Sequence, residues 1–193
     1  MAKNQPFKKS AASSKKNKAI FFDRDGVLIV DKGYAFKPET IEFNIGLVAC
    51  LNKAKNLGYL LFILTNQSGV ARGFFSLYDV YHFHQTLQFK ILESGGPVFD
   101  GVYVCPHYSE GLNKDFVKFC DCRKPGTALV EQAKHSYDLN LNESFLIGDK
   151  DSDMQCAENA GLTGVLFGSN PKGRRGTSTQ QISQLSELTD ILK

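Results

Sequence analysis

Short apolar runs alternate along the chain with stretches in which apolar residues recur every three or four positions. The runs predict strands buried on both faces, and the periodic stretches predict amphipathic helices. Such alternation indicates an α/β fold, a doubly wound parallel sheet with right-handed crossovers and helices on both faces. The expected strands span residues 19–22, 59–64, 98–104, 144–147 and 164–167, and the expected helices span 45–56, 76–93, 126–137, a segment ending near 159, and 180–192.

Polar residues follow directly after three of the expected strands. They are Asp23 and Asp25 after the first strand, Thr65 and Asn66 after the second, and Asp149 and Asp153 after the fourth. The carboxyl ends of parallel strands share one edge of the sheet, and ligands gather there. We therefore expect the three groups to converge on one site.

The first group places two carboxylates at positions i and i+2. In extended chain these positions point the same way, so Asp23 and Asp25 can face one ligand, and Gly26 lets the backbone turn away. Two like charges this close repel unless a cation or a shared proton intervenes. Mg²⁺ is the simplest remedy because it prefers oxygen ligands. The alternative from spacing alone is a strand end with two solvated acids.

Together, these groups can hydrolyse a phosphate ester. Asp23 can attack phosphorus to form an aspartyl-phosphate, and Asp25 can protonate the leaving alkoxide and then deprotonate water. Mg²⁺ held by Asp23 and Asp149 would stabilise the charge of the transferring group. Thr65 can donate a hydrogen bond to a phosphoryl oxygen, and Lys124 can supply positive charge.

The five cysteines comprise a cluster of three and two single residues, Cys50 and Cys156, which we expect to be buried small apolar side chains. The cluster and a nearby histidine form a candidate ligand set: Cys105, His107, Cys120 and Cys122. Three thiols and one imidazole suit a closed, tetrahedral and therefore structural Zn²⁺ site. The alternative is a disulfide, but cysteines two residues apart are too near for a relaxed one. The zinc loop, residues 105–122, would carry Arg123 and Lys124 to the site.

The length of 193 residues suits one domain with a substantial core. Residues 1–18 carry six lysines and no acid, and we expect a basic flexible tail there and a single phosphatase domain at 19–193. That domain carries 17 basic and 20 acidic side chains, and its mildly acidic balance argues against a nucleic-acid partner. Residues 171–176 are expected to form a solvated basic loop.

No apolar run approaches the roughly 18 residues that a membrane span needs, and the N-terminus lacks the apolar segment of a secretory signal. The odd number of cysteines fits a reducing compartment. We therefore expect a cytoplasmic protein with no membrane partner.

Four motifs resemble those of the haloacid dehalogenase-like phosphatases. They are D-x-D-G at 23–26, the threonine Thr65, the lysine Lys124 and G-D-x-x-x-D at 148–153. All four occur in the order of that family, each at its expected strand end, and the resemblance covers roughly residues 19–168. It implies a Mg²⁺-dependent phosphoric monoester hydrolase.

By this resemblance, Asp23 is the nucleophile, and Asp25 is the acid/base and also binds Mg²⁺ through its backbone carbonyl. Asp149 is a further Mg²⁺ ligand, and Asp153 is expected to orient the site or a metal-bound water. Val27 stands where threonine is commoner, which leaves the chemistry intact. The segments between the motifs are too short for an inserted cap, so we expect a capless member with an open site.

The cysteine loop narrows the resemblance to the heptose-1,7-bisphosphate phosphatases and the histidinol-phosphate phosphatases, which share it. Residues 31–34 and 65–73 favour the heptose branch, which acts in nucleotide-activated heptose synthesis for cell-surface glycans, lipopolysaccharide among them. The substrate contacts that this implies are Asp31, Lys32, Gly33, Tyr34, Asn66, Gln67, Ser68, Arg123 and Lys150. The loop departs from the usual pattern at Tyr108 and Ser109, where a second histidine and a proline are common.

The resulting expectation is a monomeric enzyme that removes the 7-phosphate of a small-molecule sugar bisphosphate. Histidinol-phosphate phosphatase is the nearest alternative. A second is a non-catalytic phosphate-ligand or protein-binding module on the same fold, against which the presence of both Asp23 and Asp25 speaks. A third is a phosphatase for nucleic-acid ends, which the acidic body disfavours.

Overall fold

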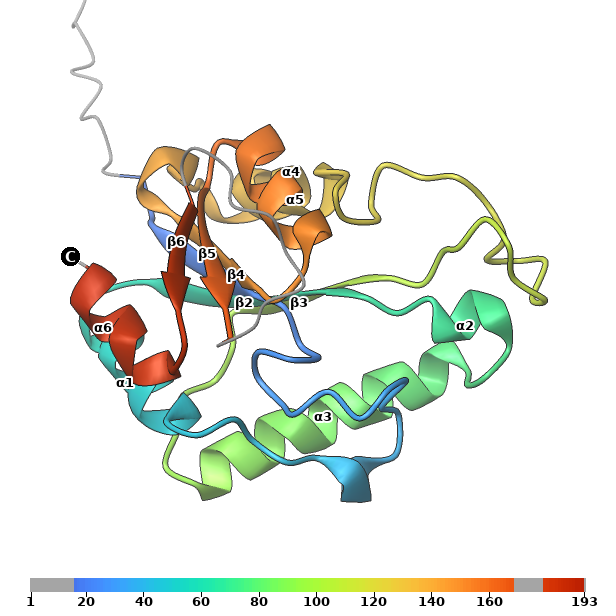
Figure 1. Ribbon diagram of the computed structural model, residues 1–193, viewed down its shortest axis with the longest axis horizontal. Helices are drawn as coiled ribbons and strands as arrows, with labels where there is room; N and C mark the ends of the chain where they lie inside the picture. The colour runs from blue at the N-terminus through green and yellow to red at the C-terminus, as the bar shows by residue number, and fades with distance from the viewer. Residues whose placement is uncertain (1–15, 169–178, 193) are drawn as a thin grey trace, which may run out of the picture.

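The computed structural model describes residues 16–168 and 179–192, and Figure 1 shows their arrangement. The expected basic tail lies outside the described residues as far as residue 15, and so does the expected basic loop at 171–176. Asn17 is bonded to the body of the fold. Its N–H donates to the carbonyl of Asp138 (3.0 Å), and its carbonyl accepts from the N–H of Asn140 (2.8 Å). The described body therefore begins just before the first strand.

Six strands form one sheet in which every neighbouring pair is parallel. The strands are β1 (Ala19–Phe22), β2 (Leu60–Asn66), β3 (Gly101–Cys105), β4 (Phe145–Gly148), β5 (Thr163–Phe167) and β6 (Thr179–Ile182). Their order across the sheet is β3-β2-β1-β4-β5-β6, so β1 lies between β2 and β4. This arrangement confirms the predicted parallel α/β sheet.

Helices cover both faces of the sheet (Figure 1). They are α1 (Leu47–Asn56), α2 (Gly69–Arg72), α3 (Leu77–Glu93), α4 (Ala128–Tyr137), α5 (Asp151–Ala160) and α6 (Leu188–Ile191), with 3₁₀ turns at Pro38–Thr40, Leu141–Glu143 and Leu185–Glu187. No cap domain interrupts the described residues. No helix in the described part of the chain is long and apolar enough to cross a membrane.

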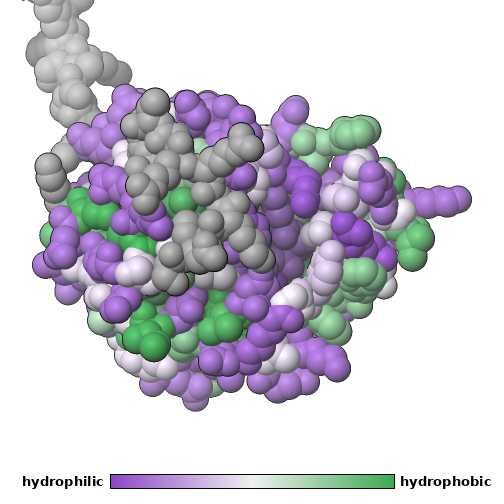
Figure 2. All heavy atoms as spheres, in the orientation of Figure 1, coloured by the Kyte–Doolittle hydropathy of each residue, from purple (hydrophilic) through white to green (hydrophobic). Residues whose placement is uncertain are grey.

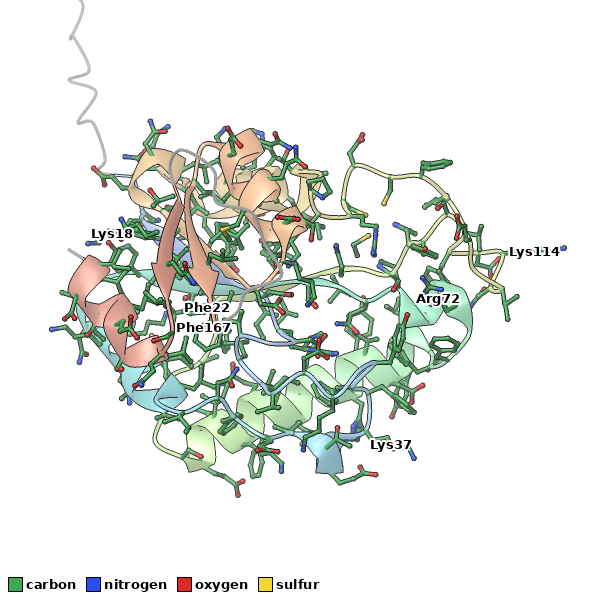
Figure 3. All side chains as sticks on the ribbon, in the orientation of Figure 1. Lys18, Phe22, Lys37, Arg72, Lys114 and Phe167 are labelled. Atoms are coloured by element: carbon green, nitrogen blue, oxygen red, sulfur yellow. The ribbon has the colours of Figure 1, made fainter. Side chains whose placement is uncertain are left out.

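The central strand β1 explains the two-layered core. All four of its residues are buried, and alternate side chains point to opposite faces. Ile20 and Phe22 pack in the cluster beneath α1, α3 and α6, whereas Phe21 packs in the cluster beneath α4 and α5. Phe22 and Phe167, both labelled in Figure 3, belong to the first of these layers. A strand buried on both faces must be apolar throughout, as its sequence is.

The long helix α3 begins where the sequence predicts, at a capping box. The Ser76 hydroxyl accepts from the N–H of Asp79, and the Asp79 carboxylate accepts from the N–H of Ser76. This reciprocal pair satisfies donors that the first helical turn leaves free. The buried stripe of the helix, which includes Val80, Phe83 and Leu87, then packs towards the sheet.

Two of the predicted elements are corrected. The expected helix at 180–192 is wrong, because its first residues form β6 and only Leu188–Ile191 is α-helical. Backbone hydrogen bonds to β5 at the edge of the sheet, with Ile182 buried below, outweigh helix propensity there. The third strand begins at Gly101 rather than at 98, because the Gln88 amide bonds the backbone of Pro97 and Phe99.

Candidate active site

The three polar groups predicted at strand ends do converge. Asp23 follows β1, Thr65 lies near the end of β2, and Asp149 follows β4, and these three strands are neighbours in the sheet. The N–H of Asp23 still donates to the carbonyl of Ile147 (2.9 Å), which holds the ends of β1 and β4 together. Carboxylate oxygens of Asp23, Asp149 and Asp153 lie within 4.8 Å of one another.

Lys124 joins the two buried carboxylates. Its Nζ lies 2.9 Å from Asp23 Oδ1 and 2.6 Å from Asp153 Oδ1, and it donates to the carbonyl of Leu64 (2.7 Å). Only 2% of its side chain is exposed. Burial alone would lower the pKa of Lys124, but Asp153 and Asp23 raise it above its usual value, so the ammonium stays charged.

Asn66 fixes the segment that carries Lys124. Its Nδ2 donates to the Lys124 carbonyl (3.1 Å), and its Oδ1 accepts from the Lys124 N–H (3.0 Å). The second strand end and the segment beyond the cysteine loop are therefore joined through one amide. Asn66 also lines the pocket described below, as expected of a substrate contact, but both ends of its amide are taken by this backbone.

Asp25 is held by a network of side chains. Arg24 binds both of its carboxylate oxygens at 2.9–3.0 Å, and Gln67 Nε2 donates to Oδ2 at 2.9 Å and to Thr65 Oγ1 at 2.8 Å. Burial raises the pKa of Asp25, and Asp23 adds to the rise, while Arg24 opposes it. A carboxyl group biased towards its protonated form suits a general acid.

Sequence reasoning missed Arg24. It stands between the two aspartates, at the position that extended chain would turn to the other face, and the pattern gave it no role. The structure buries its side chain completely and turns the guanidinium to Asp25. The only available signal was an arginine placed between two aspartates just beyond a fully apolar strand.

Asp149 completes the oxygen-rich side of the site. Lys150 Nζ lies 2.9 Å from Asp149 Oδ1, 3.4 Å from the backbone carbonyl oxygen of Asp25 and 3.8 Å from Asp23 Oδ2. A β-carbon added to Gly26, which has φ +92°, would lie 2.6 Å from Asp149 Oδ2. Glycine thus makes room for this carboxylate.

These oxygens suit a hard divalent cation. The carboxylates of Asp23 and Asp149 face the same point as the Asp25 carbonyl, since Lys150 Nζ lies near all three. An all-oxygen donor set of this kind favours Mg²⁺. Asp153 is turned instead to Lys124, at 2.6 Å from Oδ1 to Nζ.

A cavity of about 230 Å³ opens beside the carboxylates. Its lining comes from Asp25, Asp31, Gly33, Tyr34, Asn66, Gln67, Ser68, Gly69 and Lys150. On the face shown in Figure 2, hydrophilic residues gather around a hollow of this kind. The Asp31 carboxylate accepts from the N–H of Gly33 (2.9 Å), and the Tyr34 ring packs edge-on against Phe74. Seven of the nine expected substrate contacts therefore share one cavity.

The other two expected substrate contacts lie elsewhere. Lys32 Nζ forms an exposed ion pair with Glu42 at 2.7 Å. Arg123 Nη1 donates weakly to the carbonyl of His107 (3.5 Å), and its guanidinium lies 5.3 Å from the centre of the Tyr108 ring. Arg72, labelled in Figure 3, lies over the same ring at 3.9 Å.

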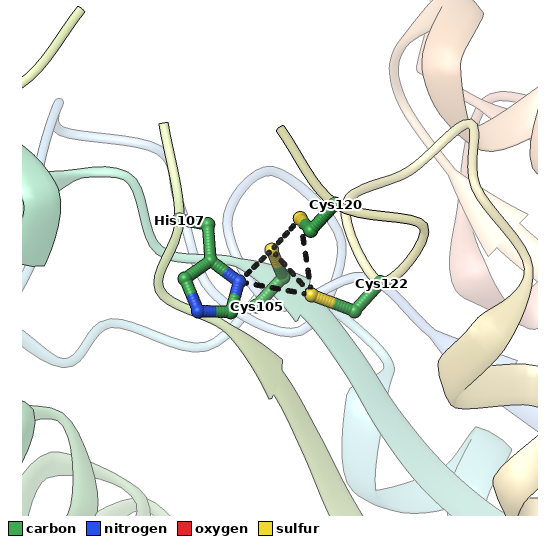
Figure 4. Close-up of side chains that lie close together, drawn as sticks. All are labelled: Cys105, His107, Cys120 and Cys122. Carbon is green, nitrogen blue, oxygen red and sulfur yellow. Dashed lines mark hydrogen bonds between the residues drawn. The ribbon is translucent and has the colours of Figure 1, made fainter. Parts of the chain in front are cut away.

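The cysteine loop forms a compact ligand cluster (Figure 4). The Sγ atom of Cys122 lies 3.1 Å from that of Cys105, 3.2 Å from that of Cys120 and 3.1 Å from His107 Nδ1. Sulfur atoms at these separations form no disulfide, which needs about 2.05 Å. The four side chains can hold one metal ion, and their softness favours zinc over magnesium. Cys50 and Cys156 are free and buried, as predicted.

Known proteins share both the sequence and the fold of this chain. A family model described as HAD-hydrolase-like matches residues 121–184. The D-glycero-beta-D-manno-heptose-1,7-bisphosphate 7-phosphatase of Helicobacter pylori (strain ATCC 700392 / 26695) is 39% identical over 178 residues, which make up 92% of this chain and 98% of that protein. The chain belongs to the heptose-1,7-bisphosphate 7-phosphatase family.

Other members of this family are named for the alpha anomer of the heptose bisphosphate. The D-glycero-alpha-D-manno-heptose-1,7-bisphosphate 7-phosphatase of Burkholderia mallei (strain ATCC 23344) is 39% identical over 153 residues, 79% of this chain and 80% of that protein. Among solved structures, the D,D-heptose 1,7-bisphosphate phosphatase of B. bronchiseptica, complexed with magnesium and phosphate, has a TM-score of 0.78 at 26% identity and covers 90% of this chain and 97% of its own.

A HAD-like phosphatase of Mesorhizobium loti has a TM-score of 0.82 at 28% identity and covers 92% of this chain and 85% of its own. These structures confirm the predicted haloacid dehalogenase-like fold.

Proposed function

We propose that this chain is a Mg²⁺-dependent phosphatase that removes the 7-phosphate of D-glycero-D-manno-heptose 1,7-bisphosphate. The observation that carries the proposal is the buried contact of Lys124 with Asp23, beside a separately held Asp25. A nucleophilic carboxylate needs a fixed cation next to it. A general acid/base needs separate partners, so that its protonation state can differ from that of the nucleophile. Family membership supplies the substrate class.

Asp23 acts as the nucleophile. Its Oδ1 accepts from Lys124 Nζ at 2.9 Å and from the N–H of Arg24 at 2.8 Å, and these two contacts fix the orientation of the carboxylate for attack on phosphorus. Attack forms the Asp23–phosphorus bond and breaks the bond from phosphorus to the oxygen on C7. Lys124 and Lys150 offset the repulsion between carboxylate and phosphate.

Asp25 supplies and later removes the proton. As a general acid it protonates the leaving C7 oxygen, and as a general base it then takes a proton from the water that attacks the aspartyl-phosphate. Hydrolysis restores the Asp23 carboxylate and releases inorganic phosphate. Gln67 holds Asp25 through Oδ2 and also donates to Thr65 Oγ1, so the hydroxyl hydrogen of Thr65 stays available for a phosphoryl oxygen.

Asp23, Asp149 and the Asp25 carbonyl are the groups that would hold Mg²⁺. When bound, the ion neutralises charge on the transferring phosphoryl group. Gly26 keeps the Asp149 carboxylate in place beside it, because a larger residue would collide with that side chain.

The cavity lining favours a bisphosphate over histidinol phosphate. Lys150 lies at the boundary between the carboxylates and the cavity, and a second phosphate needs a cation beyond the reacting group. The ammonium of histidinol phosphate would instead need a carboxylate that is not already paired. Asp31 is the candidate for that role, but its carboxylate already accepts from the N–H of Gly33 and lies 4.0 Å from Lys150 Nζ.

The test is phosphate release with Mg²⁺ from both anomers of heptose 1,7-bisphosphate and from histidinol phosphate, with Asp23→Asn as the blank. We expect kcat/KM to favour one heptose anomer over histidinol phosphate by at least about a hundredfold, or about 2.7 kcal/mol. Preference for histidinol phosphate would overturn the substrate, and inactivity on every ester with folded protein would favour a phosphate-binding module.

We further propose that Cys105, His107, Cys120 and Cys122 hold a structural zinc, and that the enzyme works as a monomer in the cytoplasm. Four protein ligands leave no open position for catalysis, and free thiols persist in a reducing compartment. Light scattering of the purified protein tests the monomer, and a dimer would contradict it.

A further inference from the structure

Arg24 is a completely buried cation with a dense set of partners. Its Nε and Nη2 donate to both oxygens of Asp25, and Nη2 also donates to the Ala35 carbonyl (2.7 Å) and to Gln67 Oε1 (3.1 Å). The guanidinium carbon lies 4.4 Å from the centre of the Phe83 ring. Burying a charge is costly unless its partners compensate, and the contacts of Nε and Nη2 supply that compensation.

Within residues 16–168 and 179–192, Arg24 has one counter-ion within bonding distance. On the α3 side, His84 is buried beside it, and burial together with the charge of Arg24 lowers the pKa of His84 to about 3, so the imidazole is neutral. Asp25 is therefore the one carboxylate that balances the guanidinium among the described residues. A two-pronged contact fixes the rotation of that carboxylate as well as its position.

Arg24 also connects three segments of the chain. Asp25 lies just beyond β1, Gln67 follows β2, and Ala35 follows the stretch at 31–34, of which Asp31, Gly33 and Tyr34 line the cavity. Its contacts therefore tie the acid/base to both walls of the substrate pocket. Asp25 keeps 19% of its side chain exposed, which is the edge that can meet a substrate oxygen.

We propose that Arg24 is a positioning residue that holds the Asp25 carboxyl group in the orientation required to protonate the leaving oxygen. This inference rests on the proposed function, because it needs Asp25 to be the general acid. The Arg24 side chain acts on the substrate only through Asp25, whose carboxylate it holds. Its loss therefore affects only substrates whose leaving group needs a proton.

Leaving-group dependence separates this role from a structural one. Sugar phosphates leave as alkoxides and need the proton, whereas p-nitrophenyl phosphate leaves as a stable phenolate and does not. The comparison uses kcat/KM, which reports steps up to departure of the leaving group and excludes the later hydrolysis. The ratio of the two kcat/KM values does not depend on the fraction of folded enzyme, so a poorly folding variant still gives an answer.

The variants are Arg24→Lys, which keeps charge but loses the two-pronged contact, and Gln67→Met, which removes the second holder of Asp25. We expect Arg24→Lys to lower kcat/KM for heptose bisphosphate by about a hundredfold and for p-nitrophenyl phosphate by less than about threefold. Gln67→Met should lower the ratio of the two kcat/KM values in the same direction, but by a smaller factor than Arg24→Lys. The control is Lys55→Met, which breaks the ion pair with Asp100 far from the site and should leave the ratio unchanged.

Asp25→Asn separates the two levels of the proposal. If it shows the leaving-group dependence and Arg24→Lys lowers both substrates equally, the role of Arg24 is wrong and the proposed function stands. If Asp25→Asn also lowers both substrates equally, Asp25 is not the general acid, and both the mechanism and the role of Arg24 fail.

Discussion

The ammonium of Lys150 lies 2.9 Å from Asp149 Oδ1, on the oxygens that we assign to Mg²⁺. Burial alone would lower the pKa of Lys150, but Asp23 and Asp149 raise it above its usual value, so it carries a charge. Lysine and metal therefore compete for the same carboxylates. Removing the lysine charge with Lys150→Met should tighten Mg²⁺ binding about tenfold and raise KM for the bisphosphate.

Isothermal titration of Mg²⁺ without substrate measures the metal half of this prediction. Lys32→Met is the control, since Lys32 pairs with Glu42 and should leave Mg²⁺ affinity unchanged. Weaker Mg²⁺ binding by Lys150→Met would contradict the competition.

Gly26 and Gly58 separate backbone strain from a collision at the site. Both have positive φ, +92° and +81°. A β-carbon at Gly26 would strike the Asp149 carboxylate, whereas a β-carbon at Gly58 would point into open space. Either alanine substitution costs about 1–2 kcal/mol of strain. Gly26→Ala should also abolish Mg²⁺ binding and turnover, while Gly58→Ala lowers the melting temperature alone. Equal effects on Mg²⁺ binding would show that the close approach is unimportant.

The cysteine cluster predicts about one zinc per chain in metal analysis of the purified protein. Cys122→Ser should lose the zinc and lower the melting temperature, because the loop that leads to Lys124 loses its anchor. Cys50→Ala removes a buried thiol outside the cluster and should keep the zinc. A fully stable, zinc-free wild-type protein would rule out the structural role.

His84 makes stability depend on pH. Its pKa in the folded protein is about 3, well below the 6.5 of an exposed histidine, so the unfolded chain binds the proton first as pH falls. The stabilisation is complete above pH 6.5 and is lost progressively towards pH 3. When the pH falls from 7 to 5, protonation of His84 in the unfolded chain should lower the free energy of unfolding by about 2 kcal/mol.

Urea denaturation at both pH values, for wild type and His84→Phe, measures this term. The variant should lose about 2 kcal/mol less than wild type over that interval. An identical pH dependence in the two proteins would mean that His84 is not buried in its neutral form.

The convergence of Asp23, Thr65 and Asp149 was predictable because parallel topology brings strand ends to one edge. The place of Lys124 was not predictable from spacing, since Asn66, 58 residues away, fixes its backbone. The role of Arg24 was equally hidden, because its partners come from three segments. Such contacts depend on packing across the sheet, which no local pattern reports.

The same limit explains the errors in the elements. Leu188–Ile191 is helical as predicted, but residues 179–182 gain more from pairing with β5 than from extending that helix. Lys32 looked equivalent to its neighbours in the stretch at 31–34, yet it turns to Glu42. A surface lysine can point into a site or pair with a nearby acid, and the choice depends on its side-chain rotamer, which the sequence does not determine.

The central claim is that Asp23 carries the phosphoryl group, and trapping tests it most directly. Asp25→Asn protein is mixed with Mg²⁺ and p-nitrophenyl phosphate, which needs no acid for its leaving group, so the aspartyl-phosphate forms but its hydrolysis is slow. Borohydride reduction then converts the phosphorylated residue to homoserine, which peptide mass spectrometry locates. We predict homoserine at position 23. Homoserine at position 25, 149 or 153, or none with p-nitrophenol released, would contradict the account.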